Sequence, residues 1–272
     1  MSDTKELTKT KSSNVVSYEG MEEYSGTGFG EVGADDLSIP FLRILAQLSP
    51  QVNKQDGAYV PGAEAGMMFN TVLNETYDGE KGIHVVPCHY NRRLVEWKQR
   101  EQGGGYVGSY LPDDPIKDTT TQNERGQDML PNGNILTNTA QFFVLMLHPT
   151  FGAQRVLMTM SSTQLKKGRK WLTQAQSMTA KGKNGIYVLP LMSQVYTVKT
   201  TPEKNDKGNW FGWDISRERA LDLSVPADKD IFESAVGFAK SVEAGEVKVK
   251  DEAPEEAKDV TPNTSDGNQD IM

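Results

Sequence analysis

The sequence predicts an α+β fold that is mainly β, with a small barrel or sandwich as its core and a few added helices. Short apolar or alternating segments, bounded by Gly, Pro, Asp and Asn, recur between residues 66 and 215, which is typical of strands joined by turns. Two segments, 161–178 and 226–245, follow helical spacing instead. Strands therefore outnumber helices in the predicted core.

The domain organisation follows from length and composition. The chain has 272 residues, enough for one domain with a substantial core, but only 36% of them are hydrophobic. We expect a flexible arm at residues 1–34, a single β-rich domain at 35–245 and a disordered acidic tail at 246–272. Cys88 is the sole cysteine and no apolar run is long enough to cross a bilayer, so we expect a soluble protein in a reducing cytosol.

The first half of the domain is expected to contain one short helix and several strands. Apolar residues between Pro40 and Pro50 follow helical spacing, and residues 66–82 begin as an apolar strand and end in a turn. Strands are predicted at 83–90 and 92–99. The Gly- and Pro-rich residues 101–134 are expected to form a long loop.

The second half is more strongly patterned. The continuous apolar run 139–149 predicts a central strand, with 155–160 as its partner. Ser161 and Gln164 have capping-box spacing, which predicts a helix that runs to about residue 178. Residues 185–216 predict a strand and then a hairpin, with Trp210 on its outer face, and a last helix begins near Pro226 and ends at Gly245.

Charge is distributed unevenly along the chain. The net charge is -8, yet residues 251–272 alone contain seven acidic residues and one lysine. From Arg155 to Lys183 there are seven basic residues and no acidic one. A basic body segment combined with an acidic tail is typical of proteins that bind nucleic acid.

Basic and aromatic side chains also gather locally. In LKKGRKWL (165–172) the leucines fall on one helical face and most cations on the other, which fits a solvated surface helix and a phosphate-binding face equally well. Residues 90–110 place rings and cations on predicted strands beside a glycine loop, as single-strand binders do, although a buried Trp97 beside exposed arginines is the simpler alternative. The predicted nucleic-acid-binding residues are Tyr90, Arg92, Arg93, Trp97, Lys98, Arg100, Tyr106, Lys166, Lys167, Arg169, Lys170, Trp171 and Trp210.

Motifs for enzymatic chemistry are weak. Residues 28–33 fit GxGxxG, but no strand precedes them and the chain has no kinase or Walker motif. His84, Cys88 and His89 are too few for a zinc site, which takes three or four protein ligands. We therefore expect no enzymatic activity, no metal and no cofactor.

Three segments together carry a resemblance to a known family: SIPFLRILAQLSPQV (38–52), GMMFNTV (66–72) and GIHVVPCHYNRRLVEWKQREQGGGYVGSY (82–110). They resemble tailed-bacteriophage proteins that bind single-stranded DNA as replication or recombination accessory proteins, over about residues 37–215. The resemblance implies an OB-like β-barrel core, no cofactor, cooperative binding with little sequence preference, and a place in the cytoplasm of the bacterial host. The acidic tail is similar in concept to those of bacterial single-strand-binding proteins, although it ends in Asp-Ile-Met rather than in acids followed by Pro-Phe.

The leading hypothesis is a sequence-independent single-stranded DNA-binding protein that supports phage DNA replication or recombination. Its acidic tail would compete with DNA for the cationic surface or recruit replication or transcription proteins through Asp270, Ile271 and Met272. The alternative is a protein-interaction or assembly factor, either a virion component or a modulator of host transcription. The sequence leaves DNA against RNA, and the oligomeric state, open.

Overall fold

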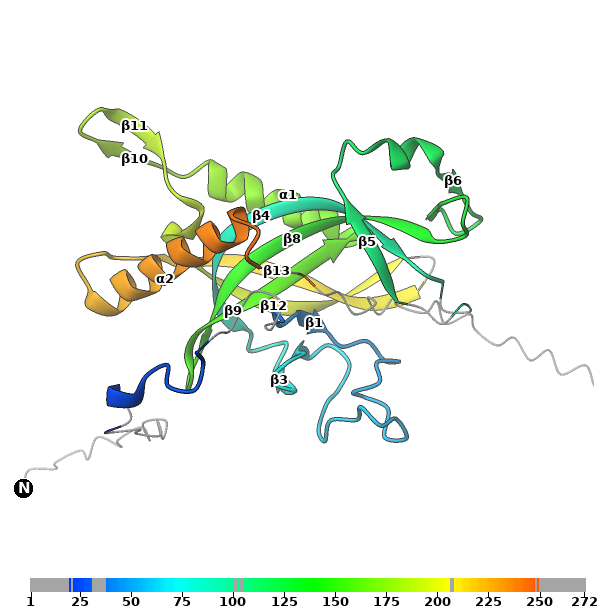
Figure 1. The fold of residues 1–272 in the computed structure, drawn as a ribbon, viewed down its shortest axis with the longest axis horizontal. Helices are drawn as coiled ribbons and strands as arrows, with labels where there is room; N and C mark the ends of the chain where they lie inside the picture. The colour runs from blue at the N-terminus through cyan, green and yellow to red at the C-terminus, as the bar shows by residue number, and fades with distance from the viewer. Residues whose placement is uncertain are drawn as a thin grey trace, which may run out of the picture.

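A strongly curled antiparallel sheet forms the centre of the computed structural model, which describes residues 20, 22–30, 38–99, 102, 105–205, 208–247 and 249 (Figure 1). Within these residues the sheet has eight strands, in the order β13-β12-β4-β8-β7-β6, with β5 paired to β4 and β9 paired to β8. The strands are β4 (Ile83–Trp97), β5 (Tyr106–Tyr110), β6 (Thr121–Gln122), β7 (Asp128–Met129), β8 (Ile135–His148), β9 (Gly152–Ser161), β12 (Gln194–Asn205) and β13 (Gly208–Ala220).

Two smaller sheets and two helices complete the described fold. A three-stranded sheet is formed by β1 (Leu42–Ile44), β2 (Met68–Asn70) and β3 (Glu75–Tyr77), and a separate hairpin by β10 (Thr179–Gly182) and β11 (Gly185–Val188). The helices are α1 (Leu165–Gln176) and α2 (Pro226–Glu243), and the short 3-10 helices are η1 (Glu22–Tyr24), η3 (Pro115–Thr119), η4 (Ser162–Gln164) and η5 (Leu191–Ser193).

The core lies on both faces of β8 because successive residues of a strand point to opposite sides. On one face Phe142 stacks on Trp171 of α1, with ring centroids 4.4 Å apart. On the other face Phe143 meets Phe238 of α2 edge to face, at 6.1 Å. Each helix therefore covers one face of the same central strand, as the apolar run at residues 142–147 of β8 requires.

The first helix also covers an edge of the sheet. Helix α1 packs against β13 as well as β8 and β9. Just before it, the side-chain oxygen of Gln164 accepts a hydrogen bond from the backbone N–H of Trp213, at 2.9 Å. The bond satisfies one backbone N–H of β13, and a helix that covers an edge strand hinders its pairing with another chain.

Three sequence-based predictions are wrong in detail. Residues 42–44 form strand β1 rather than a helix, because the neighbouring Phe41 forms a bridge with Leu157 of β9 and Ile44 pairs with Met68. The two strands expected at 83–90 and 92–99 are the single strand β4, which has a register shift between residues 87 and 89. The capping box does not form, since Ser161 makes no side-chain cap bond and Gln164 contacts the β12–β13 hairpin instead.

The coarse prediction is confirmed: the fold is mainly β, with two helices on a curled, half-barrel-like sheet. The central strand, the β12–β13 hairpin and the last helix with Pro226 at its start are all present. The predicted loop 101–134 contains β5, β6 and β7. The OB-like relationship and the three-part domain division stay predictions, and most of the predicted arm and all of residues 251–272 lie outside the described residues.

Among the described residues, no helix combines the length and the apolar character that crossing a membrane takes.

Candidate nucleic-acid interface

The outer face of α1 carries exposed cations. Lys166, Arg169 and Lys170 are exposed, while Gly168 and Trp171 are buried against the sheet. A side chain at Gly168 would have its Cβ 3.2 Å from side-chain atoms of Met160 and Phe142, so these neighbours would have to move by a few tenths of an ångström to make room for it. Gly168, Trp171 and Ala175 therefore form the face of α1 that packs on the sheet, and the cations lie on the face that points outward.

Strand β4 places a cation and an aromatic ring beside this helix. Arg92 pairs with Ala140 in the β4–β8 ladder, and a Cβ on Gly168 would lie 3.7 Å from the Ala140 Cβ, so the first half of α1 lies next to Arg92. The Arg92 Nε donates a hydrogen bond to Asn138 Oδ1 at 2.7 Å. Tyr90, two residues earlier on the same face, is half-buried against Phe142 at 5.0 Å. Two segments distant in sequence thus present like chemistry side by side.

The β12–β13 hairpin brings a third group to the helix. Trp210 donates from its indole nitrogen to Glu203 Oε2 at 2.7 Å, and Gln164 Nε2 donates to the same oxygen at 2.9 Å. Lys167 forms an ion pair with the other oxygen of Glu203. Burial alone would raise the pKa of Glu203, but the contacts from Lys167, Trp210 and Gln164 outweigh it and lower that pKa. The carboxylate stays anionic, so it balances the charge of Lys167 and holds Trp210 beside α1.

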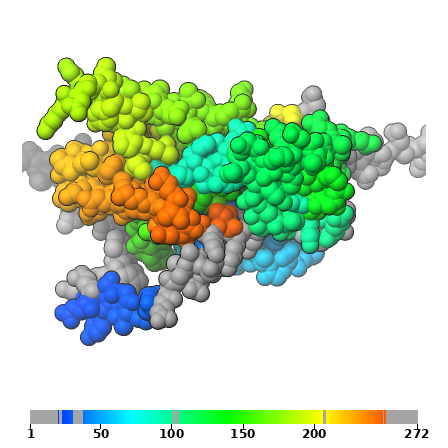
Figure 2. Space-filling model, turned by 45° about the horizontal axis from the view of Figure 1, so that its top comes forward, coloured from blue at the N-terminus to red at the C-terminus, as the bar shows by residue number. Residues whose placement is uncertain are grey.

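We call the resulting region the α1–β4 surface. In Figure 2, α1 and the middle of β4 lie on the same face of the molecule. Between α1 and β13 there is a small hollow with indole rings below and charged groups at its rim, lined by Lys167, Lys170, Trp171, Gln174, Trp213, Asp214 and Ile215. The α1–β4 surface consists of Tyr90, Arg92, Lys166, Arg169, Lys170 and Trp210, all exposed or half-exposed.

Two predicted stacking residues are not at the surface, which corrects the expectation that their rings are exposed. Trp97 is 8% exposed and packs edge to face on Tyr106 at 5.9 Å. Trp171 is 2% exposed and is covered by Phe142, because the close approach at Gly168 turns its ring toward the sheet. Their exposure was predicted from neighbouring charges, which do not determine the direction of an individual ring.

Among the described residues, Arg93, Lys98 and Tyr106 do not join the α1–β4 surface. Arg93 follows Arg92 directly and so points to the opposite face of β4. Lys98 lies about 20 Å further along the strand direction, at roughly 3.3 Å per residue, near the half-buried Tyr106. Four predicted binding residues lie outside the described part of the chain: Arg100, Asp270, Ile271 and Met272.

One exposed aromatic residue on the hairpin that follows α1 was not among the predicted nucleic-acid-binding residues. Tyr187 of β11 is 50% exposed on the hairpin that follows α1, near Lys181 in the β10–β11 ladder. The charge pattern of the sequence could have indicated this hairpin, because there is no acidic residue between Arg155 and Glu203. The basic region therefore extends from α1 onto the hairpin.

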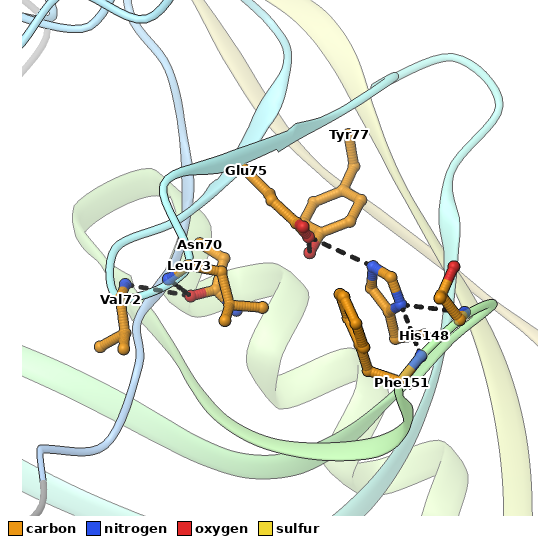
Figure 3. Close-up of polar contacts among 8 residues, drawn as sticks. Asn70, Val72, Leu73, Glu75, Tyr77, His148 and Phe151 are labelled. Carbon is orange, nitrogen blue, oxygen red and sulfur yellow. Dashed lines mark hydrogen bonds and ion pairs between the residues drawn. The ribbon is translucent and has the colours of Figure 1, made fainter. Parts of the chain in front are cut away.

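A second cluster of titratable groups is structural (Figure 3). His148 Nε2 lies 3.2 Å from Glu75 Oε2, and the Tyr77 hydroxyl donates to the same oxygen at 2.8 Å. The backbone N–H groups of Thr150 and Phe151 donate to His148 Nδ1, so the ring proton is on Nε2 and faces Glu75. Burial, reinforced by Glu75, raises the pKa of Tyr77. These contacts fasten the β8–β9 turn to β3.

The described residues also bear on metal binding and on thiol reactivity. The described residues contain no group of three or more His, Cys, Asp or Glu side chains that could hold a metal ion. Cys88 is buried, its thiol donates to the Val86 carbonyl at 3.3 Å, and burial raises its pKa to about 12. A thiol with that pKa is almost entirely protonated near neutral pH and is a poor nucleophile.

Comparison with known protein families identifies the chain as a bacteriophage protein. The model of one family, described as Pam3 phage gp34-like protein, matches residues 8–248. The chain therefore belongs to the Pam3 phage gp34-like family. No curated protein and no solved structure matches it.

Proposed function

We propose that the protein binds single-stranded DNA with little sequence preference on the α1–β4 surface and supports phage DNA replication or recombination. The observation that carries the proposal is the packing of α1 beside Arg92, which brings cations from two distant segments next to Tyr90 and Trp210. An OB-like relationship of the core belongs to the same proposal. It is supported by the curl of the sheet and by the way α1 covers the edge of β13.

Each group on the surface has a task in this proposal. Lys166, Arg169, Lys170 and Arg92 contact phosphates, which releases counterions from the strand and favours binding without reading sequence. Tyr90 and Trp210 offer ring surface on which bases stack, with about 1–3 kcal/mol for each stacked base. None of these contacts transfers a proton or breaks a bond, so the proposed activity is binding.

The acidic tail provides regulation within the same proposal. Residues 251–272 carry seven acidic residues against one lysine, so they compete electrostatically with DNA for the cationic surface or recruit a partner protein. A variant that ends at residue 250 should bind DNA more tightly at low salt than the full chain. Equal affinities would remove the competing tail from the proposal and leave the DNA contact to be judged separately.

The test of the proposal is fluorescence polarisation of labelled oligo(dT) at low ionic strength. The variant Lys166→Ala/Arg169→Ala/Lys170→Ala should bind at least about tenfold more weakly than the wild type, since phosphate contacts dominate affinity. A matched control, Lys54→Ala/Arg125→Ala/Lys240→Ala, removes the same charges from exposed positions elsewhere and should bind nearly as the wild type does.

Several outcomes would overturn the proposal. Absence of oligo(dT) binding by the wild type rejects the function, and equal losses in the two triple variants reject the surface. Tighter binding of oligo(U) than of oligo(dT) would assign the surface to RNA. A stoichiometric protein partner retained from nuclease-treated host lysate, together with no affinity for DNA, would favour an interaction or assembly factor instead.

A further inference from the structure

The β10–β11 hairpin stands apart from the main sheet and exposes apolar side chains. Its two strands have four residues each and project from the body of the molecule, at the upper left of Figure 1. Ile186, Tyr187 and Val188 are 79%, 50% and 57% exposed. Because neighbouring strand residues point to opposite faces, both faces of the hairpin carry exposed apolar groups.

Such a hairpin needs a partner to be stable. A two-stranded hairpin is at best marginally stable in water, and contiguous exposed apolar groups mark interaction sites. The hairpin also carries Lys181 and Lys183, both exposed, and contains no acidic residue. The surface that fits it is therefore apolar at its centre and acidic at its rim.

The chain itself has a surface of that kind, at the segment that leads into α2. Leu223 and Val225 are 52% and 44% exposed, and acidic side chains flank them on the loop and on the outer face of the helix. We call residues 222–233 the acceptor segment; its exposed charged residues are the acids Asp222, Asp230 and Glu233 and one lysine, Lys229, which lies 3.7 Å from Glu233.

The hairpin and the acceptor segment lie at the same end of the molecule. The hairpin closes at its base with a hydrogen bond from Leu189 N–H to the Met178 carbonyl, at 2.8 Å, and η5 follows directly. Leu221 N–H then bonds the Ser193 carbonyl of η5 at 2.9 Å, which places the start of the acceptor segment beside the hairpin base. Both regions are on the left in Figures 1 and 2. They nevertheless stay exposed within one chain.

We propose that this end of the protein binds a second copy of the chain, with the hairpin of each copy seated on the acceptor segment of the other. A twofold contact uses one patch on both subunits, so a basic apolar element and an acidic apolar element side by side make that patch self-complementary. The apolar side chains supply the buried centre, and the lysines and acids supply the polar rim that sets orientation. This inference goes beyond the proposed DNA binding and does not depend on it.

Charge reversal provides the test, measured by sedimentation velocity on the full chain at micromolar concentrations. The hairpin variant Lys181→Glu/Lys183→Glu and the acceptor variant Asp230→Lys/Glu233→Lys should each dissociate at least about tenfold more readily than the wild-type dimer, because like charges then face each other. An equimolar mixture of the two variants should form dimers again, since both contacts of the mixed pair join opposite charges. Circular dichroism of each variant controls for folding.

The results of this experiment distinguish between the possible partner surfaces of the hairpin. A wild type that is monomeric at these concentrations rejects the proposal, as does a wild-type dimer that both variants leave unchanged. Dissociation of the hairpin variant with no recovery in the mixture would assign the hairpin to a different partner surface. Dimers that disappear when residues 251–272 are deleted would assign the contact to the acidic tail.

Discussion

The indole nitrogen of Trp210 lies 2.7 Å from Oε2 of Glu203, its directly paired neighbour on β12. Glu203 also receives Lys167 and Gln164 from the start of α1, so one carboxylate joins the hairpin tip to the basic helix. Among the four tryptophans, Trp210 alone is not buried. A ring held in place but partly open to solvent is the arrangement that base stacking needs, because little conformational entropy is lost on binding.

Trp210→Ala is therefore expected to weaken oligo(dT) binding by about five- to 150-fold, the equivalent of about 1–3 kcal/mol for one stacked base. The unfolding free energy should change little by comparison, since the ring is half-buried. Polarisation titrations and urea denaturation measure the two effects. A large loss of stability with unchanged affinity would show that Trp210 is structural.

Trp97→Ala is the matched comparison and should behave in the opposite way. Its side chain is 8% exposed, so removing it leaves a cavity and should lower the unfolding free energy by about 3–5 kcal/mol. The fraction that stays folded should bind oligo(dT) with nearly wild-type affinity. A selective loss of affinity, with wild-type denaturation midpoints, would return Trp97 to the binding surface.

Glu96→Gln should destabilise the contacts that join β4 to β5 and to the turn between β7 and β8. Glu96 is 3% exposed and accepts hydrogen bonds from Tyr110 at 2.6 Å, Asn132 at 2.9 Å and Asn134 at 2.5 Å. A glutamine amide would turn N–H groups toward these donors, at a cost of about 2 kcal/mol in unfolding free energy. Urea denaturation at neutral pH measures the change. An unchanged midpoint would mean that the loops do not depend on this carboxylate.

The same carboxylate predicts a pH dependence. Burial alone would raise the pKa of Glu96, but the bonds from Asn134, Tyr110 and Asn132 outweigh it and lower the pKa. Its contribution is therefore complete above the unfolded value of about 4.3 and is lost as the pH falls through the lower folded value. Below about pH 4 the stability of the wild type should fall faster than that of Glu96→Gln. Parallel curves would contradict this assignment.

Cys88 should resist thiol reagents in the native protein. Its thiol is buried and its pKa is raised to about 12 by burial, so little thiolate exists at pH values near neutrality. Reaction with a disulfide reagent at mildly alkaline pH should be slow for the folded chain and fast in guanidinium chloride. Rapid reaction without denaturant would show that this part of β4 opens.

Strong periodicity predicted the fold where it was present, and long-range contacts decided it elsewhere. The apolar run of β8 and the stripe of α2 follow from side-chain alternation and helical spacing. Residues 41–48 have helical spacing too, but pairing with β2 and β9 overrides it. Local patterns do not contain such partners, which lie tens of residues away.

The proposed binding surface, too, could be predicted from the sequence only in part. The cations of α1 and Arg92 were identified from the sequence, because charge clustering is local. The sequence does not reveal that Lys167 forms an ion pair with Glu203, that the Trp171 ring is buried, or that Tyr187 is exposed. Each of these depends on contacts between segments that are distant in the sequence or on where the hairpin lies in the fold, which local patterns do not contain.

The salt dependence of oligo(dT) binding tests the central claim most directly. The logarithm of the association constant should fall linearly with the logarithm of salt concentration, with a slope of about -0.7 for each phosphate contacted on a single strand. Removing three phosphate contacts in Lys166→Ala/Arg169→Ala/Lys170→Ala should therefore make the slope shallower by about 2. An unchanged slope in this variant, or wild-type affinity that does not depend on salt, would contradict DNA binding on the α1–β4 surface.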